Sequence, residues 1–135
     1  MKRSEEKIYF VKDWLKLAKE NLLFAIAGMK EDFSPYQTIC FLCQSSAEKY
    51  LKAYLILSGW DLKKIHNMNN LLAFCFDYDR SFENLKEECI ILNQYVVTSR
   101  YPSDFTSENI GKNEAKEAID ATSKIEQFVL NKLNF

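Results

Sequence analysis

The stretch SPYQTICFLCQSSAEKYLKAYLILSG, residues 34–59, decides the fold. Ser34 fits a helix N-cap, Pro35 fits the first helical position, and Gln37 stands where a capping box is completed. Gly59 ends the predicted helix. Between them, apolar residues recur every three or four positions, as on one helix face: Tyr36, Cys40, Cys43, Ala47, Tyr50, Leu51, Tyr54 and Leu55. The sequence therefore predicts a helix from the Ser34 cap to about Ser58.

A polar stripe accompanies this apolar face: Gln44, Ser45, Glu48, Lys49 and Lys52. Glu48 and Lys52 are four residues apart, in the order that favours an ion pair on a helix. Spacing alone makes Ser45, Ser46, Glu48 and Lys49 a solvent-exposed stripe.

The same spacing of apolar residues predicts four more helices. Their expected ranges are 4–28, ending at Gly28 as a left-handed cap; 68–76, after an Asn67 cap; 81–100, after a Ser81 cap; and a last helix after an Asn113 cap. Pro102 disfavours helix beyond that fourth range. We therefore expect an all-α fold, an antiparallel up-and-down bundle of about five helices, in one domain over residues 1–135.

Composition excludes several classes of protein. Only 3 glycines and 2 prolines occur in 135 residues, and an all-β chain needs both in its tight turns. The 18 Lys and Arg residues nearly balance the 19 Asp and Glu residues, so no strong global field attracts nucleic acid or an acidic membrane. No apolar run approaches the roughly 18 residues of a membrane helix, and no apolar signal-peptide segment follows the N-terminal residues. We expect no membrane association and a cytoplasmic location.

The four cysteines are predicted to be reduced core residues. Cys40 and Cys43 form a C-x-x-C pair, but the segment around them is apolar. Cys75 and Cys89 stand alone, so no second pair completes a zinc site.

Few kinds of catalytic site fit the chain. The phosphate-binding loops G-x-x-x-x-G-K-[ST] and G-x-G-x-x-G are absent, as is the G-x-S-x-G nucleophile turn. His66 is the single histidine, which excludes a multi-His metal site. We expect neither a metal nor another cofactor.

Two side chains suit contact with phosphate. His66 follows Lys63 and Lys64 between the second and third expected helices. It is either a locally hydrogen-bonded residue or a proton donor or phosphate contact. Arg100 ends the fourth expected helix, where it either complements the helix dipole or offers its planar fork to a phosphate. The residues alone leave both alternatives open.

The sequence resembles the HEPN (higher eukaryotes and prokaryotes nucleotide-binding) domain family in three places, in the same order along the chain. Residues 44–55, QSSAEKYLKAYL, are similar to the family pattern Q-x-x-A-E-K-x-x-K-A. His66 matches the family's T-H-D-L segment, although its neighbours differ, and Arg100-Tyr101-Pro102 matches its R-Y-P. Residues 14–22, WLKLAKENL, also look like the family's first helix. The resemblance covers essentially the whole chain.

This resemblance implies a helical bundle, usually a homodimer, that takes part in nucleotide or RNA transactions. Many relatives are encoded beside a minimal nucleotidyltransferase, and some such pairs are toxin–antitoxin modules. The active relatives are metal-independent RNases marked by an Arg that a His follows shortly afterwards. Here residues 101–106 contain no histidine after Arg100, so RNase activity is not expected.

The expected function is thus a non-catalytic nucleotide- or RNA-associated binding module that acts with a minimal nucleotidyltransferase partner. One alternative is a metal-independent RNase using Arg100 and His66. Another is a structural adaptor bundle without a nucleotide ligand.

Two further expectations concern surfaces. We predict a homodimer, because apolar residues lie off the core stripes of the first two helices: Phe10, Leu17, Phe24, Phe41 and Leu42. We also predict one anion-binding surface made by Arg100, His66, Lys63 and Lys64. This surface assumes that the second and fourth helices run in the same direction, which brings the 59–66 connection near Arg100.

Overall fold

The computed structural model describes residues 2–98 and 110–134 of the chain. Its helices are α1 (Lys2–Gly28), α2 (Tyr36–Ser58), α3 (Met68–Tyr78), the 3-10 helix η1 (Arg80–Leu85), α4 (Lys86–Asn93), α5 (Tyr95–Thr98) and α6 (Lys112–Leu133). No strand occurs in these ranges, and the predicted all-α bundle is confirmed. Among the described helices, none has the length and apolarity needed to cross a membrane.

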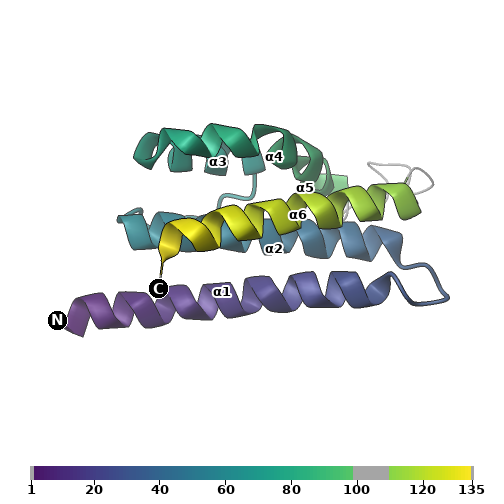
Figure 1. Ribbon diagram of the computed structural model, residues 1–135, viewed down its shortest axis with the longest axis horizontal. Helices are drawn as coiled ribbons and strands as arrows, with labels where there is room; N and C mark the ends of the chain where they lie inside the picture. Colours follow the sequence, from purple (N-terminus) through teal and green to yellow (C-terminus); the bar gives the residue numbers. More distant parts are fainter. Residues whose placement is uncertain (1, 99–109, 135) are drawn as a thin grey trace.

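Helix α2 is the centre of the bundle. It contacts α1 on one side, α6 on another and the α3–α5 segment on a third (Figure 1). The apolar stripe predicted for it is its core face, in which Cys43, Ala47 and Tyr50 are buried. Helix α6 runs parallel to α2: the Thr122 hydroxyl donates to the Cys43 carbonyl at 3.1 Å, and further along both helices Glu126 accepts from the Tyr50 hydroxyl at 2.5 Å (Figure 1).

The direction of the middle helices differs from the expectation. The connection after Gly59 turns back along α2, so that His66 reaches Glu48 in the middle of that helix. Helix α3 then runs in the same direction as α2, and η1–α4 runs in the opposite direction (Figure 1). The assumption that the second and fourth helices share a direction is therefore wrong. A few extended residues cover the same distance as two turns of helix, so the connection can return along α2 before α3 begins. The spacing of apolar residues within the helices does not predict the path of such a connection.

Two predicted helix ends are wrong in detail. Helix α2 begins at Tyr36 with Pro35 as N-cap and has no side-chain cap hydrogen bond. Ser34 has a φ of 53°, and its carbonyl accepts from the Tyr36 amide at 2.8 Å, so this tight turn removes it from the extended N-cap conformation. Gly28 has no left-handed φ. Instead, a Cβ there would lie 3.0 Å from Ile39 Cγ1, so this glycine lets α1 approach α2 closely.

Other helix ends follow the sequence more closely. Gly59 ends α2, as predicted, and it is a left-handed C-cap with φ of 111°. The Asn67 side chain accepts from the Asn70 amide at 3.0 Å and begins α3, as predicted.

The last two helix starts differ by a few residues. Asp79, rather than Ser81, caps the fourth segment by accepting from the Ser81 amide at 2.9 Å, and that segment is divided into η1, α4 and α5. Helix α6 begins at Lys112, where the Glu114 carboxylate accepts from the Gly111 amide at 2.9 Å; Asn113 lies inside the helix.

The four cysteines pack as predicted. All four are buried, and none is in a disulfide. Burial raises the pKa of the Cys40 thiol to about 11 and that of Cys43 and Cys89 to about 12, so these groups stay protonated at neutral pH. In the described residues, no group of three or more His, Cys, Asp or Glu side chains is arranged to hold a metal ion.

Candidate anion-binding site

Glu48, in the middle of α2, joins three polar side chains. One of its oxygens accepts from Gln44 Nε2 at 2.9 Å, and the other accepts from Lys52 Nζ at 2.9 Å. His66 Nδ1 lies 3.0 and 3.1 Å from the two oxygens. These four residues come from α2 and from the connection that folds back along it.

The Glu48–Lys52 pair is largely shielded from water. The side chain of Lys52 is 4% exposed and that of Glu48 is 12% exposed. Burial by itself raises the pKa of Glu48, but hydrogen bonds from Lys52, Gln44 and His66, with the charge of Lys52, outweigh it and lower the pKa below the usual value. Glu48 is therefore a carboxylate, and its charge is balanced locally by Lys52.

This carboxylate fixes the orientation of His66. A carboxylate can only accept, so His66 carries a proton on Nδ1 when its ring is neutral. Nε2 is then the unprotonated nitrogen, and the side chain is 39% exposed. Glu48 thus holds the ring by Nδ1, and Nε2 remains as the hydrogen-bond acceptor of the neutral ring.

Lys49 contributes a charge that no carboxylate balances directly. Its Nζ donates to Asn21 Oδ1 at 2.9 Å and to Ser45 Oγ at 2.6 Å, and both acceptors are neutral. Within the described part of the chain, no carboxylate lies at ion-pair distance from it. Burial lowers the pKa of the Lys49 ammonium. The nearby Glu48 carboxylate offsets part of this effect and the Lys52 ammonium adds to it, so these three side chains carry one more positive than negative charge.

The predicted site residues are brought together only in part. His66 joins the Glu48 cluster, whereas Lys63 and Lys64 are exposed on the connection before it. Lys63 Nζ lies 6.0 Å from the centre of the Phe74 ring. Arg100 lies outside the described residues.

The connection also reaches the fourth segment. The Met68 amide donates to Asn93 Oδ1 at 2.8 Å, which places the start of α3 beside the end of α4. The turn back along α2, rather than a shared helix direction, brings these two parts of the chain together.

Sequence reasoning underestimated the polar residues of α2. The stripe predicted to be exposed is partly buried, and Ser46 is fully buried, where its hydroxyl donates to the Ala18 carbonyl at 2.6 Å. Gln44 and Lys52 are buried as well. The match of residues 44–55 to the Q-x-x-A-E-K-x-x-K-A pattern was the signal that could have indicated their burial. The spacing of polar residues does not distinguish a helix face in contact with water from a face covered by Trp14 and His66.

Comparisons with known proteins agree with this fold. The model of the HEPN domain family matches residues 11–133. The crystal structure of TT1696 from Thermus thermophilus has 30% sequence identity and a TM-score of 0.78, and the match covers 90% of this chain and 97% of that chain. The crystal structure of ST0689, described as an archaeal HEPN homologue, has 25% identity and a TM-score of 0.71, with 90% and 96% covered. A comparison with curated proteins gives no match.

Proposed function

The chain belongs to the HEPN domain family, and from that premise we propose that it is a nucleotide- or RNA-associated binding module. It works as a homodimer with a minimal nucleotidyltransferase partner, in the manner of a toxin–antitoxin pair. Its ligand is a phosphate-bearing anion held at the Glu48–His66 cluster.

The proposed class of ligand rests on one observation, which is a surplus of positive charge in a half-buried polar cluster. Lys52 balances Glu48, and Lys49 is left with neutral partners. His66 adds a further positive charge when Nε2 is protonated. A partly desolvated cation attracts phosphate more strongly than a fully solvated one does, because the local dielectric is lower. The exposed Lys63 and Lys64 extend this attraction along the connection.

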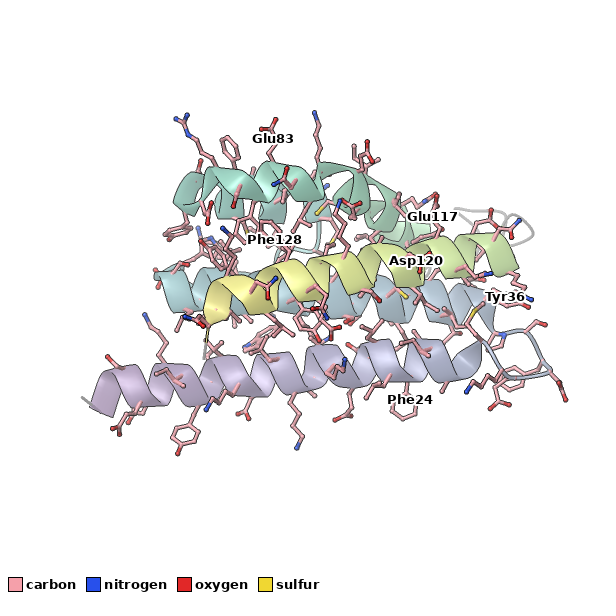
Figure 2. All side chains as sticks on the ribbon, in the orientation of Figure 1. Phe24, Tyr36, Glu83, Glu117, Asp120 and Phe128 are labelled. Carbon is pink, nitrogen blue, oxygen red and sulfur yellow. The ribbon has the colours of Figure 1, made fainter. Side chains whose placement is uncertain are left out.

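A homodimer is favoured by an apolar stripe on α1. Phe10, Leu17 and Phe24 are seven residues apart and therefore share a face; each is at least 44% exposed. Figure 2 shows the Phe24 ring pointing away from the other helices. Exposed apolar side chains aligned along a helix are typical of an interface.

The partner class comes from the family resemblance, in which the domain is often encoded beside a minimal nucleotidyltransferase. A cytoplasmic location is part of the same proposal. It is supported by the four buried, unpaired cysteines, because reduced thiols are typical of that compartment.

Binding of a fluorescein-labelled single-stranded RNA and of ATP, each followed by fluorescence or calorimetry, tests the ligand class. We expect Lys49→Gln to weaken binding several-fold, because one cation is lost from the site. The slope of the logarithm of affinity against the logarithm of salt concentration should also decrease by about one. Lys16→Gln removes the same charge from an exposed position of α1 and should leave affinity unchanged. Equal effects of the two substitutions would mean that the cluster is not the site, and no binding of either probe would favour the adaptor bundle.

A second candidate function is supported by the Glu48–His66 geometry. When Glu48 accepts from Nδ1, Nε2 is free to accept the proton of a ribose 2′-hydroxyl. The 2′-oxygen then attacks the adjacent phosphorus to form a 2′,3′-cyclic phosphate, and the 5′-oxygen leaves with a proton taken from water. This is the metal-independent RNase alternative with Arg100 as the phosphate ligand. Cleavage of RNA in EDTA that disappears in both His66→Gln and Arg100→Ala, each still folded, would establish it. If the unmodified protein does not cleave RNA, the RNase alternative is wrong and the binding module remains the proposed function.

A further inference from the structure

The neutral ring of His66 offers a hydrogen-bond acceptor to a ligand of the Glu48–His66 cluster. Its Nδ1 lies 3.0 and 3.1 Å from the two Glu48 oxygens, which can only accept, so the proton of the neutral ring is on Nδ1. Nε2 then carries a lone pair. The side chain is 39% exposed, so this ring is partly open to a ligand.

A lone pair is the wrong partner for a phosphodiester. The phosphate oxygens are acceptors as well, so they form no hydrogen bond with an unprotonated Nε2. A proton on Nε2 makes the same nitrogen a donor and gives the ring a positive charge. Protonation of His66 therefore changes both the hydrogen bonding and the charge of the cluster in the direction that phosphate requires.

Glu48 keeps its contact with His66 in both states of the ring. Nδ1 is a donor in the neutral ring and in the protonated ring. The carboxylate stays ionised, because hydrogen bonds from Lys52, Gln44 and His66 and the charge of Lys52 lower the pKa of Glu48. The ring can thus take up a proton at Nε2 without turning, and Glu48 acts as a positioning residue.

The charged groups nearest the ring come from α2. Glu48 contacts the ring, Lys52 pairs with Glu48 at 2.9 Å, and Lys49 adds one further positive charge. Helix α1 places uncharged side chains against these lysines, since Trp14 lies beside Lys52 and Asn21 accepts from Lys49. A proton on Nε2 is therefore added to a cluster that already has a positive surplus.

The chain on either side of His66 does not remove this surplus. The connection before it carries Lys63 and Lys64, both exposed. Its acid, Asp61, lines a hollow with Lys7, near the start of α1 and the end of α2. Residues 67–76, which follow the ring, are uncharged. A bound phosphate offsets the repulsion that the added proton meets, so the ligand and the proton favour each other.

We propose that the Glu48–His66 cluster binds a phosphodiester of RNA together with one proton, which His66 takes up at Nε2. This inference rests on the proposed function, because it concerns the same ligand at the same site. Histidine ordinarily changes charge between about pH 5 and pH 8. An apparent affinity falls with the fraction of the protein in the binding-competent state, so RNA is held more tightly as the pH falls through this range.

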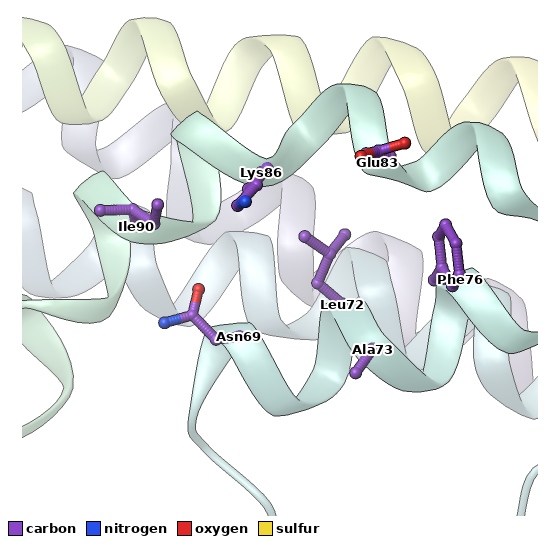
Figure 3. A pocket seen from close by; sticks show the side chains of 7 residues that line it. All are labelled: Asn69, Leu72, Ala73, Phe76, Glu83, Lys86 and Ile90. Carbon is purple, nitrogen blue, oxygen red and sulfur yellow. The ribbon is translucent and has the colours of Figure 1, made fainter.

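A hollow elsewhere in the molecule provides a control position. It has a volume of about 410 Å³ and lies between α3 and the η1–α4 segment (Figure 3). The charged side chains that line it are Glu83 and Lys86, one of each sign. Lys86 is thus a cation at a place without a positive surplus, where no preference for phosphate is expected.

The test is isothermal titration calorimetry of the full chain with an unlabelled oligouridylate that has no terminal phosphate. Neither the bases nor the phosphodiesters of this probe exchange a proton between about pH 6 and pH 8, where histidine does. We expect the affinity to be at least about tenfold higher at pH 6 than at pH 8. Titrations at pH 8 in buffers with different ionisation enthalpies should show that binding takes up close to one proton.

Three variants, each checked for folding by circular dichroism, locate the effect. His66→Gln keeps a polar side chain beside Glu48 but takes up no proton, so it should lose both the pH dependence and the proton uptake. Lys49→Gln should weaken binding by the same factor at both pH values and keep the pH dependence. Lys86→Gln should bind as the unmodified chain does.

The ring can also be observed directly, because His66 is the single histidine of the chain. Nitrogen-15 NMR should show the proton on Nδ1 in the free protein at pH 8 and protons on both ring nitrogens in the RNA complex. Equal affinity at the two pH values, a pH dependence that persists in His66→Gln, or a neutral ring protonated on Nε2 would overturn proton uptake and leave the proposed function standing. No binding at either pH, or equal losses in Lys86→Gln and Lys49→Gln, would overturn both.

Discussion

Glu48 of α2 contacts parts of the chain whose proximity cannot be predicted from the spacing of residues in the sequence. It binds its helix neighbours Gln44 and Lys52, and it also holds His66 from the next connection. The pair with Lys52 could be predicted, since an i, i+4 pair follows from the sequence. The contact with His66 could not, because it depends on the path of an irregular connection. The burial of Lys52 likewise depends on Trp14 of α1, whose ring centre lies 6.0 Å from Lys52 Nζ.

Removal of one member of this buried pair should be costly. Glu48→Ala leaves the Lys52 ammonium buried without a carboxylate, and we expect the free energy of unfolding to fall by about 3 kcal/mol. In the double variant Glu48→Met with Lys52→Met, apolar side chains replace both charges, and most of that stability should return. Urea unfolding followed by circular dichroism measures both. If the double variant is as unstable as Glu48→Ala, the buried and unpaired charge of Lys52 is not the cause of the lost stability.

Acid should destabilise the protein through two carboxylates. Hydrogen bonds from Lys132 and Ser81 lower the pKa of Asp79 from 3.8 to about 2, and the Glu48 pKa is also lowered. A carboxyl group whose pKa is lower in the folded state stabilises the fold above its unfolded pKa, and this stabilisation is lost as pH falls through the folded pKa. We therefore expect the urea midpoint to fall between about pH 4.5 and pH 2. In Asp79→Asn the urea midpoint should decrease less over this pH range than it does in the unmodified protein. If the two proteins show the same dependence of the midpoint on pH, Asp79 has no role in the acid sensitivity.

At the scale of the element, apolar spacing located the helices and local sequence located some of their ends. The buried faces of α2 and α6 follow the spacing, with Cys43 and Ala47 on one helix and Ala118 and Ile125 on the other. Helix caps were harder to predict, since Ser34 has the right chemistry but the wrong backbone conformation. The direction of α3 was not predictable, because the connection before it has no periodic pattern.

Gly59 allows a sharp test of one helix end. Its φ of 111° is left-handed, and an added Cβ would meet no atom within 4 Å. Gly59→Ala should therefore cost about 1 kcal/mol through backbone strain alone. Asn tolerates this region better than Ala, so Gly59→Asn should lose less. Thermal unfolding of the three proteins compares them, and an Ala variant as stable as the Asn variant would contradict the backbone explanation.

At the scale of the whole molecule, α1 is covered on one face only. Val11, Ala18, Leu22 and Ala25 pack onto the bundle, and Phe10, Leu17 and Phe24 form the exposed stripe on another face. The sequence indicated this stripe because its residues lie off the core spacing. Phe41 and Leu42, which lie off the core spacing of the second helix, are partly buried, and Leu42 packs against the core.

Leu17→Glu tests whether this stripe is the dimer interface. The residue is 49% exposed, so a glutamate at this position should leave a single chain folded. In a two-fold dimer both copies would place a charge in the apolar contact, and we expect dimerisation to weaken by at least about a hundredfold. Leu23→Glu is the matched control: Leu23 is 52% exposed on the same helix but lies on a different face, outside the stripe. Light scattering at micromolar concentration should give twice the chain mass for the unmodified protein and for Leu23→Glu, and the mass of one chain for Leu17→Glu. A monomer in the unmodified protein, or a dimer that survives Leu17→Glu and dissociates in Leu23→Glu, would assign the stripe to another role.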